Sequence, residues 1–347
     1  MSMRAVSIIG HGGNEVVDVA TRPVPRRRRG EALVRLRAAG LNRVDLYMRD
    51  SGAGITHRLP QIMGLDGAGE VAEIDADETR LAVGDRVVVH PGIGCGRCEH
   101  CLAGEHVLCT TMSYLGEHRD GTLAEFVRVP VENVFPVPVG FDLAEAAALA
   151  TAPLTAWRMV FTKARLASHE TVLILGIGGS VSLAALSFAK TIGARAIVTS
   201  RDPEKLARAV TLGADVGIDG SREPIARRVL AETGGRGVDV VIENVGEAVW
   251  GEALKSLARG GRIVTCGATS GDAPSADLRR LFIRQISVHG STHGTFEEFR
   301  RLIAVCERGL YRPILDRTFP LAETHAALDR LEAGRQFGKI AIDIDTP

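Results

Sequence analysis

Four cysteines fall within fifteen residues of the chain, at positions 95, 98, 101 and 109. Thiolates at these short spacings can surround one zinc ion tetrahedrally, and the longer step to the last cysteine closes the lobe. Four sulfur ligands leave no position for water or substrate, so we predict a zinc that stabilises the fold and takes no part in a reaction. The alternative is free cysteines or disulfides. The predicted metal ligands are Cys95, Cys98, Cys101 and Cys109.

A second segment suited to chemistry runs from Thr171 to Ser182, where an apolar run leads into a glycine-rich stretch and then a helical pattern. This order is typical of a dinucleotide site, because glycines admit the pyrophosphate and the helix start offers unpaired N–H groups. Ser180 and Ser182 stand where glycines often occur, so a purely structural turn is the alternative. The predicted dinucleotide contacts are Gly176, Gly178, Gly179, Ser180 and Val181.

The end of the next predicted strand indicates which dinucleotide binds. An NAD site usually has an acidic residue there, whereas this strand ends in Ser200 and Arg201, with Lys205 one helical turn beyond. Ser200 brings no carboxylate to repel a phosphate, and the planar guanidinium of Arg201 suits a 2′-phosphate. We therefore predict NADP(H) over NAD(H). The alternative is that Arg201 simply faces solvent.

The elements that must position these groups differ along the chain. Residues 1 to about 150 contain short β-type runs broken by glycine and proline, which favours an irregular β-rich domain. From about 153 to 290, apolar strands alternate with amphipathic helices, which predicts a parallel sheet covered on both faces. The tail from about 293 contains two helical patterns and a final strand at 339–344, which needs a sheet edge in the first zone.

The composition excludes some functions and places the protein in a broad class. Lys plus Arg equals Asp plus Glu at 42 each, which gives no support for a nucleic-acid or membrane-surface partner. The basic run at 26–29 follows two prolines and is interpreted as a solvated turn. No apolar stretch approaches the length of a membrane span, and no signal-peptide pattern opens the chain. The expected location is the cytoplasm.

The β-rich first zone, the cysteine lobe, the dinucleotide fold and the returning tail together resemble the medium-chain dehydrogenase/reductase superfamily. The resemblance implies an α/β protein in which a Rossmann doubly wound parallel sheet accompanies a GroES-like β-rich catalytic domain. The implied catalytic domain covers residues 1–152, with the zinc lobe at about 91–112. The implied NADP-binding domain covers 153–292, and residues 293–347 return to the catalytic domain. The implied active site lies between the two domains.

The zinc alcohol dehydrogenases of this superfamily hold a second, catalytic zinc, and this sequence lacks its ligands. Asn42 replaces the cysteine of the Gly-x-Cys-x-x-Asp stretch, and Leu65 replaces the histidine of Gly-His-Glu. Segment 148–157, where the third ligand usually lies, contains neither cysteine nor histidine. Leucine cannot bind a metal and asparagine is a poor zinc ligand, so no catalytic zinc is predicted. Residues 39–49 instead resemble the quinone oxidoreductase branch.

Without a Lewis acid, reduction of a conjugated acceptor is easier than reduction of a simple ketone, because the negative charge spreads into an enolate or quinol. The predicted function is therefore NADPH-dependent reduction of a quinone or α,β-unsaturated carbonyl by hydride transfer. The candidate catalytic groups are Asn42, Tyr47 and Asp45, and the resemblance implies that Thr155 contacts the cofactor. Each has a structural alternative. Asn42 could stabilise a turn, and Tyr47 could be a core aromatic. Asp45 could be a structural hydrogen-bond acceptor, and Thr155 an ordinary helix residue.

Two other functions stay open at this stage. One is a zinc-type alcohol or aldehyde dehydrogenase that recruits its metal through unexpected ligands. The other is a non-catalytic NADPH-binding protein, such as a redox sensor or structural protein. The expected partner is a small-molecule acceptor (a quinone, enone or aldehyde), and the resemblance implies a homodimer or homotetramer. No proton relay is recognisable in the sequence, which leaves solvent as the proton source.

Overall fold

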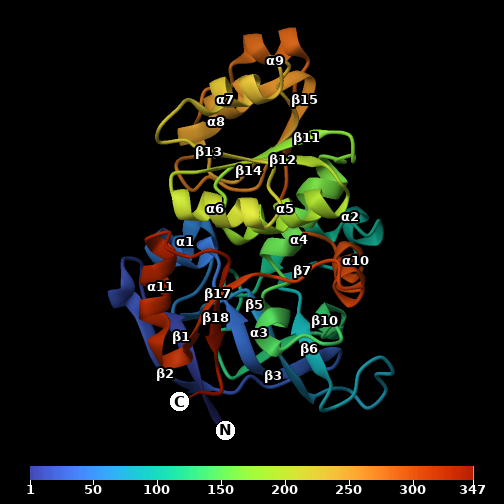
Figure 1. The fold of residues 1–347 in the computed structure, drawn as a ribbon. Coiled ribbons are helices and arrows are strands. Elements are labelled where there is room, and N and C mark those ends of the chain that lie inside the picture. Colours follow the sequence, from blue (N-terminus) through green and yellow to red (C-terminus); the bar gives the residue numbers. More distant parts are fainter. Residues whose placement is uncertain (347) are drawn as a thin grey trace. The chain divides into compact units, whose positions relative to one another are not determined.

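The computed structural model describes residues 1–346. The chain divides into two compact units, the first made of Met1–Ala152 with residues 295–347 and the second of Pro153–Gly294 (Figure 1). No helix among the described residues is both long and apolar enough to cross a lipid bilayer.

The main sheet of the first unit has seven strands, centred on β3 (Glu31–Gly40). Alternate residues of β3 such as Ala32, Val34 and Leu36 are buried in the core of the unit, as a strand with one core-facing side requires. In order across the sheet lie β10 (Val134–Pro136), β6 (Arg86–Val89), β5 (Asp66–Glu73), β3, β18 (Lys339–Asp343) and β17 (Leu315–Pro320), with β9 (Phe126–Pro130) also pairing with β3.

The tail of the chain completes this sheet. Strand β18 runs antiparallel to β3, with Ala341 opposite Gly40, and parallel to β17. The sequence analysis predicts no strand at β17, because Asp316, Arg317 and Thr318 interrupt its apolar pattern. An edge strand tolerates these residues, since one of its sides is free for solvent.

Two small sheets and several short helices complete the first unit. One sheet has the order β2 (Val17–Pro23), β1 (Ser2–Ile8), β4 (Gln61–Ile62), and the other pairs β7 (Gly92–Ile93) with β8 (Ser113–Tyr114). The helices are α1 (Arg43–Ser51), α2 (Glu99–Leu102), α3 (Leu143–Ala147), α10 (Phe296–Glu307) and α11 (Thr324–Glu332).

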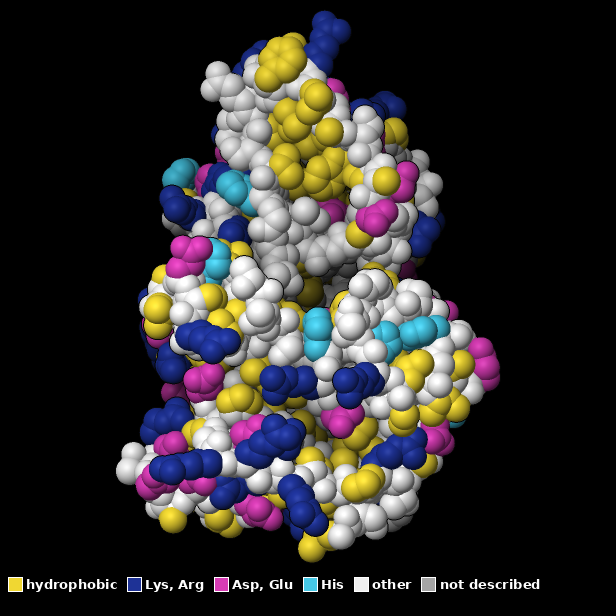
Figure 2. Space-filling view, turned by 180° about the vertical axis from the view of Figure 1, so that it is seen from behind, with side chains coloured by type: hydrophobic (Ala, Val, Ile, Leu, Met, Phe, Trp, Pro, Cys, Tyr) yellow, Lys and Arg dark blue, Asp and Glu magenta, His cyan; other side chains and the backbone are white. Residues whose placement is uncertain are grey.

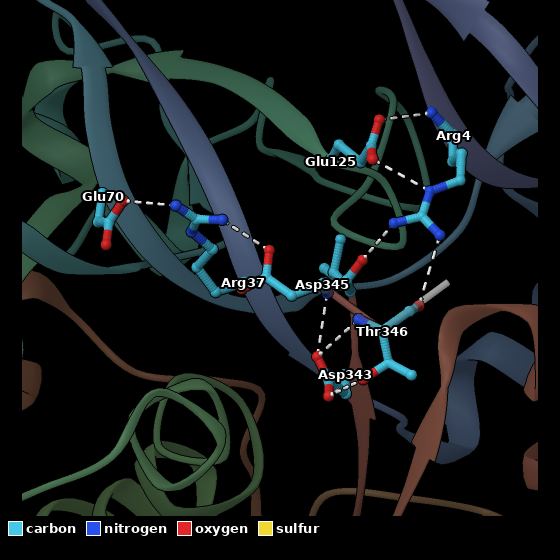
Figure 3. A network of polar contacts seen from close by, with 8 residues as sticks. Arg4, Arg37, Glu70, Glu125, Asp343, Asp345 and Thr346 are labelled. Atoms are coloured by element: carbon cyan, nitrogen blue, oxygen red, sulfur yellow. Dashed lines mark hydrogen bonds and ion pairs between the residues drawn. The ribbon is translucent and has the colours of Figure 1, made fainter.

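An ion pair from Arg37 and hydrogen bonds from Arg4 hold the C-terminal segment against the rest of the first unit (Figure 3). The guanidinium of Arg37 donates to Glu70 at 3.0 Å and to Asp345 at 2.6 Å. Arg4 donates to Glu125 at 3.0 Å and to the carbonyl oxygen of Ile344 at 2.8 Å. Contacts with both β1 and β3 therefore fix the chain beyond β18.

The second unit contains one parallel sheet of six strands. Their order is β13 (Val216–Asp219), β12 (Arg195–Ser200), β11 (Thr171–Ile174), β14 (Val238–Glu243), β15 (Leu257–Thr265), β16 (Ser287–Gly290). Counted from β11, this is the order 3-2-1-4-5-6 of a doubly wound Rossmann sheet, as predicted. The central strands are buried on both faces, which explains their continuous apolar sequence.

Helices cover both faces of this sheet. Figure 1 shows α5 (Ser180–Thr191) and α6 (Pro203–Thr211) on one face, with α7 (Ile225–Glu232) and α8 (Glu247–Ser256) on the other. Helix α9 (Leu278–Arg284) precedes the edge strand β16. Helix α4 (Ala152–Trp157) leads into the unit and continues as a π-helical segment, Arg158–Lys163.

Candidate functional site

The four lobe cysteines converge on one point. Their Sγ atoms all lie within 4.8 Å of one another, and those of Cys95 and Cys101 are 3.9 Å apart. A tetrahedral zinc with Zn–S bonds of about 2.3 Å places sulfurs about 3.8 Å apart. All four are free thiols, not disulfides. Among residues 1–346, this is the only group of three or more Cys, His, Asp or Glu side chains arranged to hold a metal ion.

Hydrogen bonds prepare several of these sulfurs to be thiolates. The backbone N–H of Cys95 donates to Cys109 Sγ, and that of Cys98 donates to Cys95 Sγ, both at 3.3 Å. The Thr111 hydroxyl is the main group that lowers the pKa of Cys109 to about 6, whereas burial raises the pKa of Cys101 to about 12. A divalent cation between them is what stabilises four negative sulfurs together. The lobe therefore fits a zinc ion.

The glycine-rich turn has the geometry of a dinucleotide site. Gly176 and Gly178 have φ angles of 66° and 114°, which side chains rarely adopt. A Cβ at Gly176 would lie 2.9 Å from Val245 Cγ2. The turn is held by Thr199, whose carbonyl oxygen accepts from Ile177 N–H at 2.7 Å and whose hydroxyl accepts from Gly176 N–H at 3.3 Å.

Helix α5 starts directly after this turn. Gly179 is its N-cap and supplies no side chain to cap it, and the half-buried Ser180 and Val181 form its first turn. The first N–H groups of α5 therefore have no side-chain cap from Gly179 and are available to an anion. Ser182 instead has a structural role, because its hydroxyl donates to the Leu175 carbonyl oxygen and accepts from Asn244, both at 2.8 Å.

The residues predicted to select the phosphate lie at two separate places. The Ser200 hydroxyl accepts from Asp202 N–H at 3.1 Å and so shapes the turn into α6, while Arg201 is exposed. The Lys205 side chain lies against the glycine turn, since a Cβ on Gly178 would come 3.5 Å from Lys205 Nζ. Lys205 thus lies beside the glycine turn, whereas Arg201 is exposed at the start of the next turn.

Glu243 braces the loop that faces the glycine turn, and the sequence analysis misses it. Its carboxylate is fully buried and accepts from the N–H groups of Val245 and Gly246, both at 2.6 Å, and from the Thr265 hydroxyl at 2.8 Å. These bonds keep Val245 against Gly176. The sequence pattern that could have identified Glu243 is an acidic residue at the end of an apolar strand, because a buried acid needs hydrogen-bond or charge partners.

In the first unit, Asn42 belongs to a buried polar cluster with Asp66 and Lys339. Lys339 Nζ lies 2.6 Å from both Asn42 Oδ1 and Asp66 Oδ2, and the Asn42 amide donates to Asp66 Oδ2 at 3.0 Å. The Lys339 and Asp66 side chains are 2% and 0% exposed. Lys339 is a second residue that the sequence analysis misses, although a lysine that opens a buried strand is the signal for it.

Asp45 and Tyr47 lie on α1, which begins after Asn42. The buried Asp45 carboxylate accepts from the backbone N–H of Asn42 at 2.7 Å and so caps the helix. Burial raises the pKa of Asp45 to about 7, and the negative charge of Asp66 adds to the increase. The backbone N–H of Asn42 and the positive charge of Lys339 oppose it. Tyr47 is half-buried further along the helix. The structure thus brings Asn42 and Asp45 together.

Known proteins share both halves of this architecture. Residues 28–139 match the alcohol dehydrogenase GroES-like domain, and residues 180–308 match the zinc-binding dehydrogenase domain. An alcohol dehydrogenase of Geobacillus stearothermophilus is 31% identical, over 92% of this chain and 93% of its own. An NAD-dependent alcohol dehydrogenase of Sulfolobus acidocaldarius is 31% identical over 96% and 98%. A crystal structure of an NAD-dependent alcohol dehydrogenase superposes with a TM-score of 0.95 at 39% identity, covering 99% of this chain and 100% of that one.

The chain belongs to the zinc-type alcohol dehydrogenase branch of the medium-chain dehydrogenase/reductase superfamily. It is an oxidoreductase of that family. The names of these relatives favour the alcohol dehydrogenase alternative over the quinone or enone reductase that the sequence analysis prefers. Several are also named NAD-dependent, so the predicted NADP preference gains no support from them.

The catalytic zinc of this branch does not fit the residues found here. Asn42, at the first ligand position, directs its side-chain oxygen at the ammonium of Lys339, 2.6 Å away. Leu65, at the second position, is buried and has no donor atom. The positive charge of Lys339, held beside both Asn42 and Asp66, disfavours a second cation at these oxygen atoms. Thr155, the predicted cofactor contact, is buried on α4.

Proposed function

We propose that this protein transfers hydride between a nicotinamide dinucleotide and the carbonyl carbon of a small alcohol–carbonyl pair, without a catalytic zinc. The observation that carries the proposal is the glycine turn at Gly176 and Gly178, open to a pyrophosphate at the start of α5, in a chain of the zinc-type alcohol dehydrogenase branch. The zinc of the cysteine lobe has a structural role in this proposal, because four thiolates complete its coordination shell.

The buried cluster of Asn42, Asp66 and Lys339 supports the metal-free part of the proposal. The Lys339 ammonium contacts both Asn42 Oδ1 and Asp66 Oδ2, so it fixes a positive charge beside Asn42, while Asp66 Oδ1 is buried without a hydrogen-bond partner. Hydride addition to a carbonyl places negative charge on its oxygen, and fixed dipoles and charges stabilise such an oxygen when water is excluded. We propose that Asn42, with Asp45 and Tyr47 on the helix that follows it, supplies the polar groups of the acceptor site.

A screen with metal quantification tests this function. The purified enzyme is assayed for oxidation of primary and secondary alcohols with NAD⁺ and NADP⁺, and for reduction of aldehydes, ketones, enones and quinones with NADH and NADPH. We expect alcohol–carbonyl turnover with one zinc per chain. Two zinc ions per active chain would contradict the metal-free site. Tight dinucleotide binding without turnover of any substrate would favour a non-catalytic protein.

A second candidate function is reduction of a quinone or α,β-unsaturated carbonyl. The replacement of zinc ligands by Asn42 and Leu65 favours it, because a conjugated acceptor delocalises its charge and depends less on a Lewis acid. Turnover confined to enones and quinones in the same screen would select this candidate.

For the cofactor, we propose NADP(H), with Arg201 as the group that binds the 2′-phosphate. Support comes from the absence of an acidic residue at the end of β12 and from the exposed guanidinium that follows it. Titration with NADPH and NADH tests this, and Arg201→Ala should weaken NADPH binding alone. Equal affinities of the unmodified protein for both cofactors would contradict the proposal.

We further propose a homodimer built through the edge of the dinucleotide sheet. Edge strand β16 carries Val288 at 44% exposure, and α9 before it exposes Leu278 and Phe282 at 70% each. Figure 2 shows apolar side chains gathered on this unit. A second copy would cover such an edge in a two-fold arrangement. Light scattering should give a dimer, and Phe282→Asp should shift it toward the monomer.

A further inference from the structure

A tight turn after the zinc lobe packs on Gly64, two residues before Asp66 of the buried polar cluster. It runs from Tyr114 to Arg119 and is closed by the N–H of His118, which donates to the Tyr114 carbonyl oxygen at 3.0 Å. Gly116, at its centre, has a φ of 73°, and a Cβ there would lie 2.6 Å from the carbonyl oxygen of Gly64. The turn is therefore held in a fixed position beside the predicted acceptor site.

This turn carries one carboxyl group inward. The side chain of Glu117 is only 12% exposed, whereas the next residue, His118, lies at the surface. Among residues 1–346, no donor makes a hydrogen bond to the Glu117 carboxyl group, and no Lys or Arg lies within ion-pair distance of it. A largely buried carboxylate without a donor or a cation is costly, so such a group favours its protonated form.

The histidine next to Glu117 does not supply the missing charge. His118 Nδ1 is 3.9 Å from Glu117 Oε2, but it is also 3.2 Å from the backbone N–H of Tyr114 and accepts from it. A ring nitrogen that accepts a hydrogen bond carries a lone pair and cannot donate to the carboxyl group. Burial, then His57 and Arg119, hold the pKa of His118 below its usual value.

The electrostatics agree with this geometry. Burial raises the pKa of Glu117 to about 7, and the negative charge of Asp45 adds to the effect. Asp45 is itself buried and faces the Asn42 N–H, Asp66 and Lys339. The acidic group that acts on Glu117 is therefore Asp45, and the neighbouring ring of His118 has a lowered pKa.

We propose that Glu117 is the catalytic residue that exchanges the proton with the substrate oxygen. The inference rests on the proposed function. In the direction of carbonyl reduction, the oxygen of a carbonyl that receives hydride from bound nicotinamide takes the proton of Glu117, and a new O–H bond replaces the carboxyl O–H bond. The glutamate left behind regains a proton from solvent. In alcohol oxidation the same oxygen of Glu117 accepts the hydroxyl proton. General acid catalysis of this kind requires a group that titrates near the working pH.

Two variants and a matched control test the proposal. Glu117→Gln keeps the shape of the side chain without an exchangeable acid, and Glu117→Asp keeps the acid on a shorter side chain. Glu132→Gln, at an exposed glutamate of the same unit, is the control. We expect Glu117→Gln to lower kcat about 100-fold with little change in KM and to remove the pH dependence near 7. Partial recovery of rate and pH dependence is expected in Glu117→Asp, and no change in the control.

A measurement without turnover accompanies these assays. Infrared spectra of the protein free of cofactor should show protonated carboxyl absorption from Asp45 and Glu117 that disappears as the pH rises through about 7. Glu117→Gln should lose the Glu117 part of it, which comparison with an Asp45→Asn spectrum isolates. Absence of the Glu117 part in the unmodified protein overturns the proposal, as does an unchanged rate and pH profile in an active, folded Glu117→Gln enzyme. Failure of the unmodified enzyme to convert any alcohol or carbonyl instead overturns the proposed function and, with it, the role of Glu117.

Discussion

The ammonium group of Lys339 lies 2.6 Å from the carboxylate of Asp66 in a site from which solvent is excluded. Lys339 opens β18, near the end of the chain, and Asp66 opens β5, and both strands pair with β3 between them. Gly40, the last residue of β3, leaves room for this contact, because a Cβ there would lie 3.2 Å from both side chains. The returning tail therefore completes the sheet and also neutralises a buried acid beside Asn42.

Removal of the lysine charge should destabilise the protein strongly. Lys339→Met leaves Asp66 buried without its cation. We expect this to lower the free energy of unfolding by about 3–5 kcal/mol. The double variant Lys339→Met with Asp66→Leu should recover a large part of the loss. Urea denaturation measures both. The control is Lys255→Met, since Lys255 forms an exposed pair with Glu252 and its loss should change stability by less than about 1 kcal/mol. An equal effect of the two lysine variants would contradict the prediction.

Loss of the lobe zinc should affect stability more than chemistry. Cys101→Ser removes one of four ligands from a closed site, so the bound zinc should fall from one per chain toward none and the melting temperature should drop. The matched variant Cys266→Ser lies outside the lobe and should keep its zinc. Metal analysis and thermal unfolding of both proteins check this. A protein whose melting temperature is unchanged by chelation would show that the lobe does not depend on the metal.

The sequence predicts the parts of this fold that depend on local pattern. Four cysteines at short spacing, a strand that enters a glycine turn and the alternation of strands and helices each carry their signal within a few residues. The polar cluster could not be predicted in this way, because Asn42, Asp66 and Lys339 come from three separate segments. Only the pairing of β5 and β18 with β3 brings them together. The local sequence around Asn42 therefore identifies it as a candidate site residue but does not show that Asp66 and Lys339 are its partners.

The same distinction explains why Glu243 and Glu117 are absent from the sequence prediction. Glu243 ends a strand that is correctly predicted, but its importance depends on the N–H groups of the next loop turning back on it. Glu117 stands in a polar segment where exposure is the ordinary expectation, and it points inward because Gly116 packs on Gly64. A burial that depends on a distant glycine leaves no pattern near the residue.

The two raised carboxyl pKa values predict how stability changes with pH. The pKa values of Asp45 and Glu117 are about 7 in the folded protein but close to the ordinary values of 3.8 and 4.5 when the chain is unfolded. Between these limits the folded protein binds more protons, so the free energy of unfolding should fall as the pH rises from about 4 to 7. The change should be on the order of 4 kcal/mol for Asp45 and about 3 kcal/mol for Glu117.

Urea denaturation at several pH values tests this dependence. Glu117→Gln should flatten the decline between pH 5 and 7, by about half if the two groups contribute alike. Asp45→Asn should flatten it as well, while Glu132→Gln leaves it unchanged. A stability that rises over the same range in the unmodified protein would show that neither carboxyl group is protonated in the folded state near neutral pH.

The Glu243 brace should set the affinity for the dinucleotide. Glu243→Ala leaves the N–H groups of Val245 and Gly246 without their acceptor, so the loop should no longer hold Val245 against Gly176. These hydrogen bonds should contribute about one to two kcal/mol to holding the loop in place, so their loss would raise the dinucleotide Kd by about tenfold. Fluorescence titration of NADPH and NADH measures this directly, and Glu247→Ala, at the exposed start of α8, is the matched control.

Glu243→Gln distinguishes the shape of the brace from its charge. The amide oxygen can accept from both N–H groups, and the amide nitrogen can donate to the Thr265 hydroxyl, whose own proton then turns toward the carbonyl oxygen of Gly267, 3.4 Å away. If the hydrogen-bond geometry is what matters, this variant should bind the dinucleotide within about twofold of the unmodified protein, whereas Glu243→Ala should not. A glutamine variant as weak as the alanine variant would show that the negative charge itself holds the loop.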